Sequence, residues 1–159
     1  MTSQLSDKAK RFKKVFTTPG LFQGALLMKV PLLTFTGVGV QELSLERAEV
    51  SLPFGWLTKN PFGSMYFGAI MMASEAASGA MMLLHTEDYP KKVSPIVARI
   101  EGEFLRAAYS RMTFTCEDGD AIGQIIEKSN ETGEREEETV VIEGRTEEGE
   151  LASRVELDW

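Results

Sequence analysis

A single carboxylate lies inside a long apolar run of this chain. Between Met65 and Leu84, Glu75 is the only charged side chain, and its polar neighbours are Ser74 and Ser78. Burial disfavours the charged form of a carboxylate and raises its pKa, which suits a general base that works near neutral pH. The alternative is a structural acid that accepts a hydrogen bond across a subunit interface. Because isolated buried carboxylates are costly and concentrate at functional sites, we interpret Glu75 as a candidate catalytic residue.

The composition limits the chemistry that can accompany this carboxylate. The net charge of −7 argues against nucleic acid as a partner, since its phosphates must be neutralised by Lys and Arg. The chain has one cysteine and one histidine, which excludes an internal disulfide and a Cys/His zinc site, and we expect no metal and no cofactor. The first residues lack the apolar stretch of a signal peptide, which indicates a cytoplasmic protein.

The apolar run has the length of a transmembrane helix but not its composition. Residues 65–84 could span a bilayer, yet the Ala, Gly and Ser side chains among them gain little from contact with lipid. A glutamate at mid-depth would also cost about 2.5–3.5 kcal/mol. We therefore expect a helix that is buried inside a soluble protein and covered on every face, with no membrane partner.

Hydrophobic periodicity predicts the elements that must position this helix. Residues 5–17 and 20–30 have helical composition, and the second helix is expected to end near Pro31. Apolar and polar residues alternate, as in half-buried antiparallel strands, in the segments 38–43, 46–54, 96–104, 111–117, 139–145 and 151–157. Residues 121–131 are expected to form a short helix or another ordered connecting segment between two strands.

This order of elements favours an α+β fold. Two strands, one long apolar helix and about four more strands are most simply arranged as an antiparallel sheet of about five to seven strands that wraps around the helix. We expect one such domain at residues 34–159, with residues 1–33 as an N-terminal helical segment packed on it.

The stretch from Asn60 to Glu75, NPFGSMYFGAIMMASE, resembles the signature of hotdog-fold acyl-CoA thioesterases of the phenylacetate-pathway type. That signature runs Asn-x-x-Gly-x-x-His-Gly-Gly and is followed by an acidic residue on the next helix. Asn60 and Gly63 match it, and Glu75 follows Tyr66 at the spacing that separates the acidic residue from the histidine. Tyr-Phe-Gly replaces His-Gly-Gly, which indicates a divergent branch. The resemblance in layout covers about residues 34–159 and implies the hotdog fold.

Thioester hydrolysis needs a group that polarises the carbonyl, a base or nucleophile, and space for an acyl chain. A helix N-terminus presents unpaired N–H groups and a partial positive charge, so the amides of Phe67 and Gly68 are candidates for an oxyanion hole if the helix begins near Met65. Glu75 would act as general base or as nucleophile, roughly 10–12 Å further along the helix. The resemblance implies a homodimer, or a tetramer made of two such dimers, in which the acidic residue of one subunit faces the oxyanion loop of the other.

The other motif residues have both a functional and a structural interpretation. The resemblance implies that the side-chain amide of Asn60 orients water or the carbonyl, although Asn-Pro also commonly opens a turn. We expect Gly63, Tyr66, Ser78 and Gly79 to contact the substrate. Gly63 also suits a backbone requirement of the loop, and Ser78 could hold the water or simply permit close helix packing.

Two functional classes follow from these residues. The first is an acyl-CoA thioesterase that hydrolyses an acyl thioester to the free acid and coenzyme A, with Lys91, Lys92, Arg99 and Arg106 as candidates for contact with the phosphates. The second is a non-catalytic hotdog module that binds an acyl ligand or serves as a dimeric scaffold. Loss of the His-Gly pair favours the second class.

Overall fold

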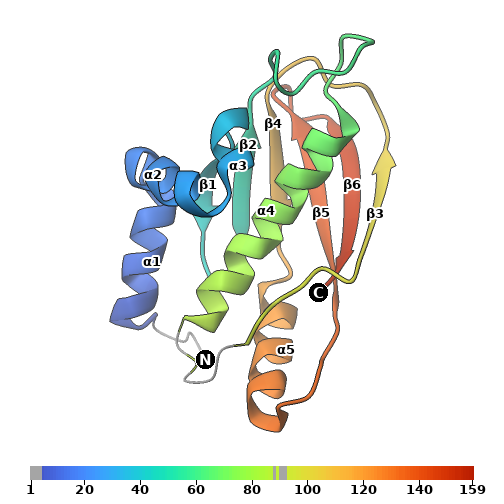
Figure 1. Cartoon of the computed structure of the whole chain (residues 1–159). Coiled ribbons are helices and arrows are strands. Elements are labelled where there is room, and N and C mark those ends of the chain that lie inside the picture. Colours follow the sequence, from blue (N-terminus) through green and yellow to red (C-terminus); the bar gives the residue numbers. More distant parts are fainter. Residues whose placement is uncertain (1–4, 88, 90–92) are drawn as a thin grey trace.

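The computed structural model describes residues 5–87, 89 and 93–159 (Figure 1). Three helices come first: α1 (Asp7–Thr17), α2 (Pro19–Lys29) and α3 (Pro31–Thr36). The other elements follow in the order β1 (Gly39–Leu43), β2 (Ala48–Leu52), α4 (Phe67–Thr86), β3 (Arg99–Phe104), β4 (Met112–Cys116), α5 (Gly119–Thr132), β5 (Thr139–Thr146) and β6 (Leu151–Asp158). In Figure 1 the sheet stands behind α4, α1–α3 lie beside that helix, and α5 lies below it.

The strands form one antiparallel sheet. The six strands are arranged in the order β1-β2-β4-β5-β6-β3, so that β1 and β3 are its edges. Helix α4 crosses one face of the sheet and contacts β1, β2, β4, β5 and β6, most extensively β2 (Figure 1). This arrangement confirms the expected α+β fold, in which an antiparallel sheet wraps around one long central helix.

Helix α4 approaches the sheet closely because its inner face is built from small residues. Ala73, Ser74 and Ala77 have no exposed surface. The hydroxyl of Ser74 donates a hydrogen bond to the carbonyl oxygen of Ile70 at 2.9 Å, so its burial leaves no unpaired donor. By length and composition α4 could cross a membrane, but 56% of its apolar window is buried within the protein. It serves here as the core helix of the domain.

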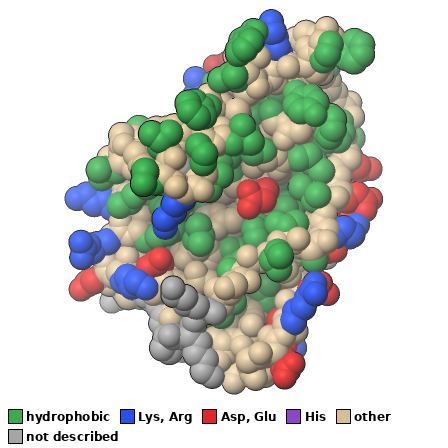
Figure 2. Space-filling model, viewed as in Figure 1, with side chains coloured by type: hydrophobic (Ala, Val, Ile, Leu, Met, Phe, Trp, Pro, Cys, Tyr) green, Lys and Arg blue, Asp and Glu red, His purple; other side chains and the backbone are tan. Residues whose placement is uncertain are grey.

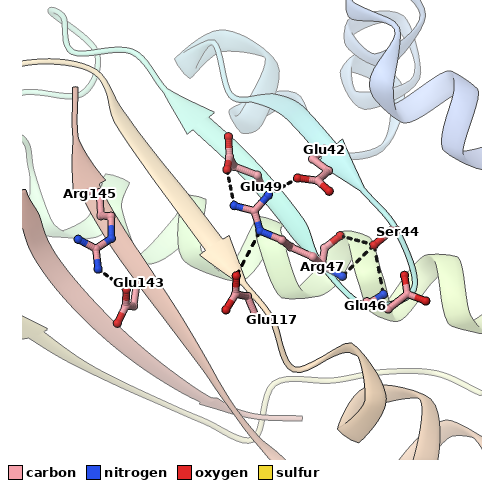
Figure 3. Close-up of polar contacts among 8 residues, drawn as sticks. All are labelled: Glu42, Ser44, Glu46, Arg47, Glu49, Glu117, Glu143 and Arg145. Atoms are coloured by element: carbon pink, nitrogen blue, oxygen red, sulfur yellow. Dashed lines mark hydrogen bonds and ion pairs between the residues drawn. The ribbon is translucent and has the colours of Figure 1, made fainter. Parts of the chain in front are cut away.

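The two faces of the sheet differ in polarity. In β2 and β4 alternate residues are fully buried: Ala48, Val50, Leu52, Met112, Phe114 and Cys116. On the opposite face Arg47 donates to Glu49 at 2.7 Å and to Glu117 at 3.3 Å, and it also pairs with Glu42 (Figure 3). The alternation expected from the sequence is therefore confirmed in these two strands.

Aromatic contacts hold the N-terminal helices together. Phe12 and Phe16 of α1 stack with ring centroids 4.1 Å apart, and Phe16 meets Phe22 of α2 at 5.4 Å. Lys8 joins α1 to the end of α4 through an ion pair with Glu87 at 3.2 Å. Helix α1 thus contacts both strand β1 and helix α4.

Helix α3 was not expected. The preceding helix was predicted to end near Pro31, and α2 does end at Lys29, but Pro31 then occupies the first turn of a further helix, α3, where the missing N–H of proline needs no partner. Gly37, with a φ of +77°, ends α3 in the left-handed conformation that glycine adopts most readily. The helical segment therefore continues to Thr36.

Helix α4 begins at Phe67, two residues after the expected start at Met65. The N–H of Met65 donates to the carbonyl of Ala108 at 2.8 Å, and that of Tyr66 donates to the carbonyl of Thr58 at 2.8 Å. Both residues are therefore held by neighbouring loops before the helix starts. These backbone hydrogen bonds do not depend on the apolar pattern of the sequence, which runs without a break from Met65 into the helix. The pattern therefore could not show at which residue the helix starts.

The start of α5 provides a test of the packing. A Cβ on Gly119 would lie 1.9 Å from the carbonyl oxygen of Leu45, so we expect Gly119→Ala to destabilise the fold by about 1–3 kcal/mol. Gly24→Ala in α2 is the matched control, because nothing lies within 4 Å of its Cβ position and alanine favours a helix by up to about 1 kcal/mol. Chemical denaturation should give opposite shifts for the two variants. Equal shifts would contradict the close approach of α5 to the β1–β2 turn.

Candidate active site

The loop that leads into α4 is held by Asn60. Its Oδ1 accepts hydrogen bonds from the N–H groups of Phe62 at 2.9 Å and Ser64 at 3.2 Å, and its Nδ2 donates to the hydroxyl of Ser64 at 2.9 Å. Gly63 has a φ of +87°, where a side chain would be strained. Asn60 and Gly63 therefore fix the shape of this loop, and the side-chain amide of Asn60 is engaged in doing so.

Two free backbone amides lie at the start of α4. Phe67 and Gly68 are its first two residues, so their N–H groups have no partner within the helix, and neither donates to another group in the described part of the chain. Aromatic rings border them. A Cβ on Gly68 would lie 2.5 Å from Cε1 of Tyr66, and Phe67 meets Phe104 of β3 with ring centroids 6.1 Å apart. The helix start can donate to an oxyanion that approaches between these rings.

Glu75 lies half-buried in the middle of α4. A Cβ on Gly79 would come within 3.1 Å of its Oε1, so the missing side chain at Gly79 makes room for the carboxylate. Among the residues that the structure describes, none donates a hydrogen bond to this carboxylate or forms an ion pair with it. Desolvation therefore acts alone and raises the pKa of Glu75. Such a carboxylate is a stronger base than an exposed one.

Ser78 lies one turn beyond Glu75 and is fully buried. Its Oγ accepts a hydrogen bond from Nε1 of Trp159 at 3.0 Å and donates to the carbonyl oxygen of Glu75 at 3.3 Å. Trp159 was not identified from the sequence. In the sequence it is an apolar residue after the last predicted strand, and nothing in that pattern predicts a contact with Ser78, 81 positions earlier.

An apolar cavity of about 370 Å³ opens beside Glu75. One wall comes from the N-terminal helices and the other from α4, and the lining includes Phe12, Phe16, Phe22, Leu33, Ala76, Ala80, Gly79 and Trp159. Figure 2 shows that hydrophobic side chains gather on this face of the molecule, while most Lys, Arg, Asp and Glu side chains lie toward its margins. The carboxylate therefore borders a space suited to an apolar group.

The two halves of the expected site are separated within one chain. Phe67 and Glu75 are eight residues apart on α4, which corresponds to about 12 Å at 1.5 Å per residue. The cavity beside Glu75 is lined by neither Phe67 nor Gly68. One subunit thus brings Glu75 together with Ser78, Gly79 and Trp159, but it does not bring the free amides to the carboxylate.

The basic residues that could meet phosphates are engaged elsewhere or lie outside the described residues. Arg99 donates to Asp158 at 2.7 Å, and Arg106 pairs with Glu150. Lys91 and Lys92 are not among the described residues. No group of three or more His, Cys, Asp or Glu side chains that could hold a metal ion occurs in the ranges that the structure describes.

Comparison with protein-family models matches residues 18–159 to the family described as a domain of unknown function, DUF4442. The match covers most of the chain, which therefore belongs to the DUF4442 family. A comparison with curated protein sequences finds no match.

Several solved structures share this fold. PA5026 of Pseudomonas aeruginosa, a protein of unknown function described as a probable thioesterase, has a TM-score of 0.72 at 22% identity, over 91% of this chain and 95% of that one. The thioesterase HI1161 of Haemophilus influenzae has a TM-score of 0.65 at 17% identity, over 91% and 92%. A mutant of the thioesterase SAV0944 from Staphylococcus aureus has a TM-score of 0.64 at 18% identity, over 81% and 96%. At these identities the likeness shows the hotdog fold alone.

The environment of Glu75 predicts how stability depends on pH. The pKa of Glu75 is raised in the folded state, so protonation of this carboxylate favours folding. The contribution of the protonated side chain to the free energy of unfolding is fully present below the ordinary pKa of 4.5, and it is lost as the pH rises through the folded-state pKa. Glu75→Gln has no such titration. The variant should therefore gain free energy of unfolding relative to the wild type at neutral pH, and this gain should shrink on acidification.

Urea denaturation of both proteins across this pH range measures the difference. Glu143→Gln is the matched control, because Glu143 lies on the charged face of the sheet and pairs with Arg145 at 2.7 Å (Figure 3). A gain for Glu75→Gln that is equal at all pH values would contradict desolvation of Glu75.

Proposed function

We propose that this protein hydrolyses an acyl thioester, with acyl-CoA as the substrate, to the free acid and coenzyme A. The observation that carries the proposal is the half-buried carboxylate of Glu75, which has no partner among the described residues and borders an apolar cavity. Such a carboxylate is a suitable base near neutral pH, beside a space that can accept an acyl group. The hotdog fold, shared with proteins described as thioesterases, supports the same class.

In the proposed reaction Glu75 takes a proton from water as the water oxygen attacks the thioester carbonyl carbon. The carbonyl oxygen becomes an oxyanion, to which the amides of Phe67 and Gly68 donate hydrogen bonds. The C–S bond then breaks, and the leaving thiolate receives the proton from Glu75. In a second route with the same residues, the carboxylate attacks the carbonyl itself, and water hydrolyses the resulting mixed anhydride.

A homodimer is the proposed active unit. Strand β3 is an edge of the sheet and exposes Ile100 and Phe104, which are 40% and 45% accessible. Pairing of β3 with its copy about a twofold axis would continue the sheet, cover these side chains and set the two α4 helices antiparallel. The start of one α4 can then face Glu75 of the other. A tetramer of two such dimers is compatible with this arrangement.

The remaining motif residues are assigned supporting roles in this proposal. Asn60 and Gly63 shape the loop that presents the free amides, and the ring of Tyr66 borders the approach to them. Gly79 leaves space for the carboxylate of Glu75 and for the thioester. Ser78 fixes Trp159 at the wall of the cavity.

A non-catalytic hotdog module is the second candidate. The observation in its favour is the helix start, where the ring of Tyr66 packs over Gly68 and Phe67 is 55% exposed. In the resembling enzymes a glycine pair leaves this approach open, whereas here two aromatic rings narrow it. Such a protein would bind an acyl ligand in the same cavity without hydrolysing it.

The cytoplasm is the proposed compartment. Cys116, which is the chain's one cysteine, is a free and buried thiol, so the fold does not depend on an oxidising environment. Burial raises the pKa of the Cys116 thiol to about 11, which keeps it protonated and unreactive.

Removal of the proposed base tests the function. Glu75→Gln retains the size and hydrogen-bonding capacity of the side chain, and we expect it to lower kcat for acyl-CoA hydrolysis by roughly 10²–10⁴ while the fold is kept. Release of free thiol measures the rate, and Glu143→Gln is the control. A Glu75→Gln enzyme that works at the wild-type rate would make Glu75 structural.

A mixing experiment tests the shared site. Phe67→Pro deletes one proposed oxyanion donor but should preserve α4, since proline is accepted at the first helical position. Loss of the donor should lower kcat by roughly 10²–10³, whereas Phe67→Ala, which retains the N–H, should not. When Phe67→Pro and Glu75→Gln subunits are unfolded together and refolded, mixed dimers contain one intact site and should regain activity.

Two results would contradict this arrangement. Activity that stays at the level of the separate variants would place both groups in one subunit. Ile100→Glu, which puts a charge on the exposed edge of β3, should yield monomers and abolish the recovery. Recovery in the presence of this third substitution would exclude pairing through β3.

A further inference from the structure

The cavity beside Glu75 is built mostly by the N-terminal helices rather than by the sheet. Phe12 and Phe16 of α1, Phe22 of α2 and Leu33 of α3 form one wall. Ala76 and Ala80 of α4, one helical turn apart, form the opposite wall. The small side chains on α4 therefore leave open a space that the aromatic side chains of α1 and α2 enclose.

Three charged side chains are among the residues that line this cavity. Glu75 lies on one side, and Lys29 and Glu87 are the other charged lining residues. Glu87 is already paired with Lys8 at 3.2 Å. Because the carboxylate of Glu75 has no positive partner among the described residues, it would repel an anionic group that entered the space. With two acidic side chains against the one basic side chain of Lys29, the lining favours an uncharged apolar occupant and disfavours a phosphate or a second carboxylate next to Glu75.

Three other cavities in the described part of the chain do not adjoin the candidate base, and one of them, of about 310 Å³, is lined by Phe54, Trp56 and Leu57 among others. One of about 460 Å³ near α5 shares Met82 and Trp159 with the cavity beside Glu75, but its lining also includes polar and charged side chains such as Asn130, Glu134 and Arg135. One of about 630 Å³ lies on the charged outer face of the sheet, with Arg47 and Glu143 in its lining. Only the space of about 370 Å³ next to Glu75 combines aromatic walls with the candidate base.

The geometry points to this cavity as the binding site for the hydrocarbon chain of an uncharged acyl group, with the helices α1–α3 as the element that sets its maximum length. The inference rests on the proposed thioester hydrolysis for the position of the carbonyl, which must lie at Glu75. At about 30 Å³ per water-sized group, 370 Å³ holds roughly a dozen such groups, which indicates an acyl chain of about eight to twelve carbons.

The same geometry explains how the product would leave. Hydrolysis converts an uncharged thioester carbonyl into a carboxylate directly beside Glu75. The two like charges repel each other in a poorly hydrated place, so the product binds less tightly than the substrate. Acyl groups that carry a second carboxylate at their far end would be excluded for a different reason, because that charge would have to enter the apolar end of the cavity.

The first experiment measures kcat/KM for straight-chain acyl-CoA substrates from two to sixteen carbons. Each added methylene that is buried should raise kcat/KM by about fourfold, until the cavity is filled near eight to twelve carbons. Ala76→Phe fills the space from the half-buried face of α4 and should lower kcat/KM by roughly 60-fold for decanoyl-CoA, as expected for about three displaced methylenes. The loss should be much smaller for acetyl-CoA and butyryl-CoA, because their short chains fill little of the cavity.

Ala121→Phe is the matched control, because Ala121 is a half-buried alanine of α5 that does not line this cavity. It should leave the whole chain-length profile unchanged. A flat profile for the wild type, or an equal loss for short and long chains in Ala76→Phe, would overturn the assignment of the cavity while thioester hydrolysis itself stands.

A binding experiment separates this inference from the proposed reaction. The chain has two tryptophans, and Trp56 is 80% exposed and does not line this cavity, so Trp56→Phe leaves Trp159 in the cavity wall as the only indole. Titration with S-decyl-CoA, a thioether that cannot be hydrolysed, should give a saturable change in emission that Ala76→Phe abolishes. Saturable binding without hydrolysis of any thioester would support the cavity and overturn the reaction. The absence of both would overturn both.

Discussion

A twenty-residue apolar helix has to be covered on all sides, and one sheet can cover only one of them. This constraint determines how the rest of the molecule is built around α4. Small residues such as Ala73 and Ala77 let the sheet approach closely on the inner side. On the outer side α1–α3 and the ring of Trp159 provide cover, and their aromatic side chains bury apolar surface that would otherwise face water. The N-terminal helices therefore bury apolar surface of α4 that the sheet alone would leave exposed to water.

The other elements do not bury α4 and the sheet completely. The groups that remain unpaired or exposed are the ones to which we assign roles in the proposed reaction. At Glu75 the neighbouring small residues, above all Gly79, leave space that no protein group fills, so the carboxylate is desolvated without being paired. At the far end of α4 the amides of Phe67 and Gly68 remain free because the helix starts there. At β3 the sheet ends before Ile100 and Phe104 are buried. A second subunit at this edge would supply the missing cover and bring the two free groups closer together.

Local pattern was sufficient to predict the sheet and the central helix, but not the contacts between distant segments. The alternation in β2 and β4 could be predicted because one face is buried and the other carries Arg47 and its acidic partners. Glu75 could be singled out because charge is rare in an apolar run. By contrast, the hydrogen bond from Trp159 to Ser78 and the approach of Gly119 to Leu45 join residues that are far apart in sequence and meet only when the whole chain has folded. The cavity itself could not be predicted, since its walls come from helices far apart in sequence. Whether the site residues act as assigned stays a prediction.

The position of α1 also has a consequence for the encounter with ligands. Residues 1–36 carry six basic side chains and one acidic one, whereas the whole chain has a net charge of −7, so the remainder of the molecule is strongly acidic. This separation puts the positive end of the protein's electric field at the helices that wall the cavity. A ligand with an apolar tail and a polyanionic head would be oriented by that field before contact, and its association rate would depend on ionic strength.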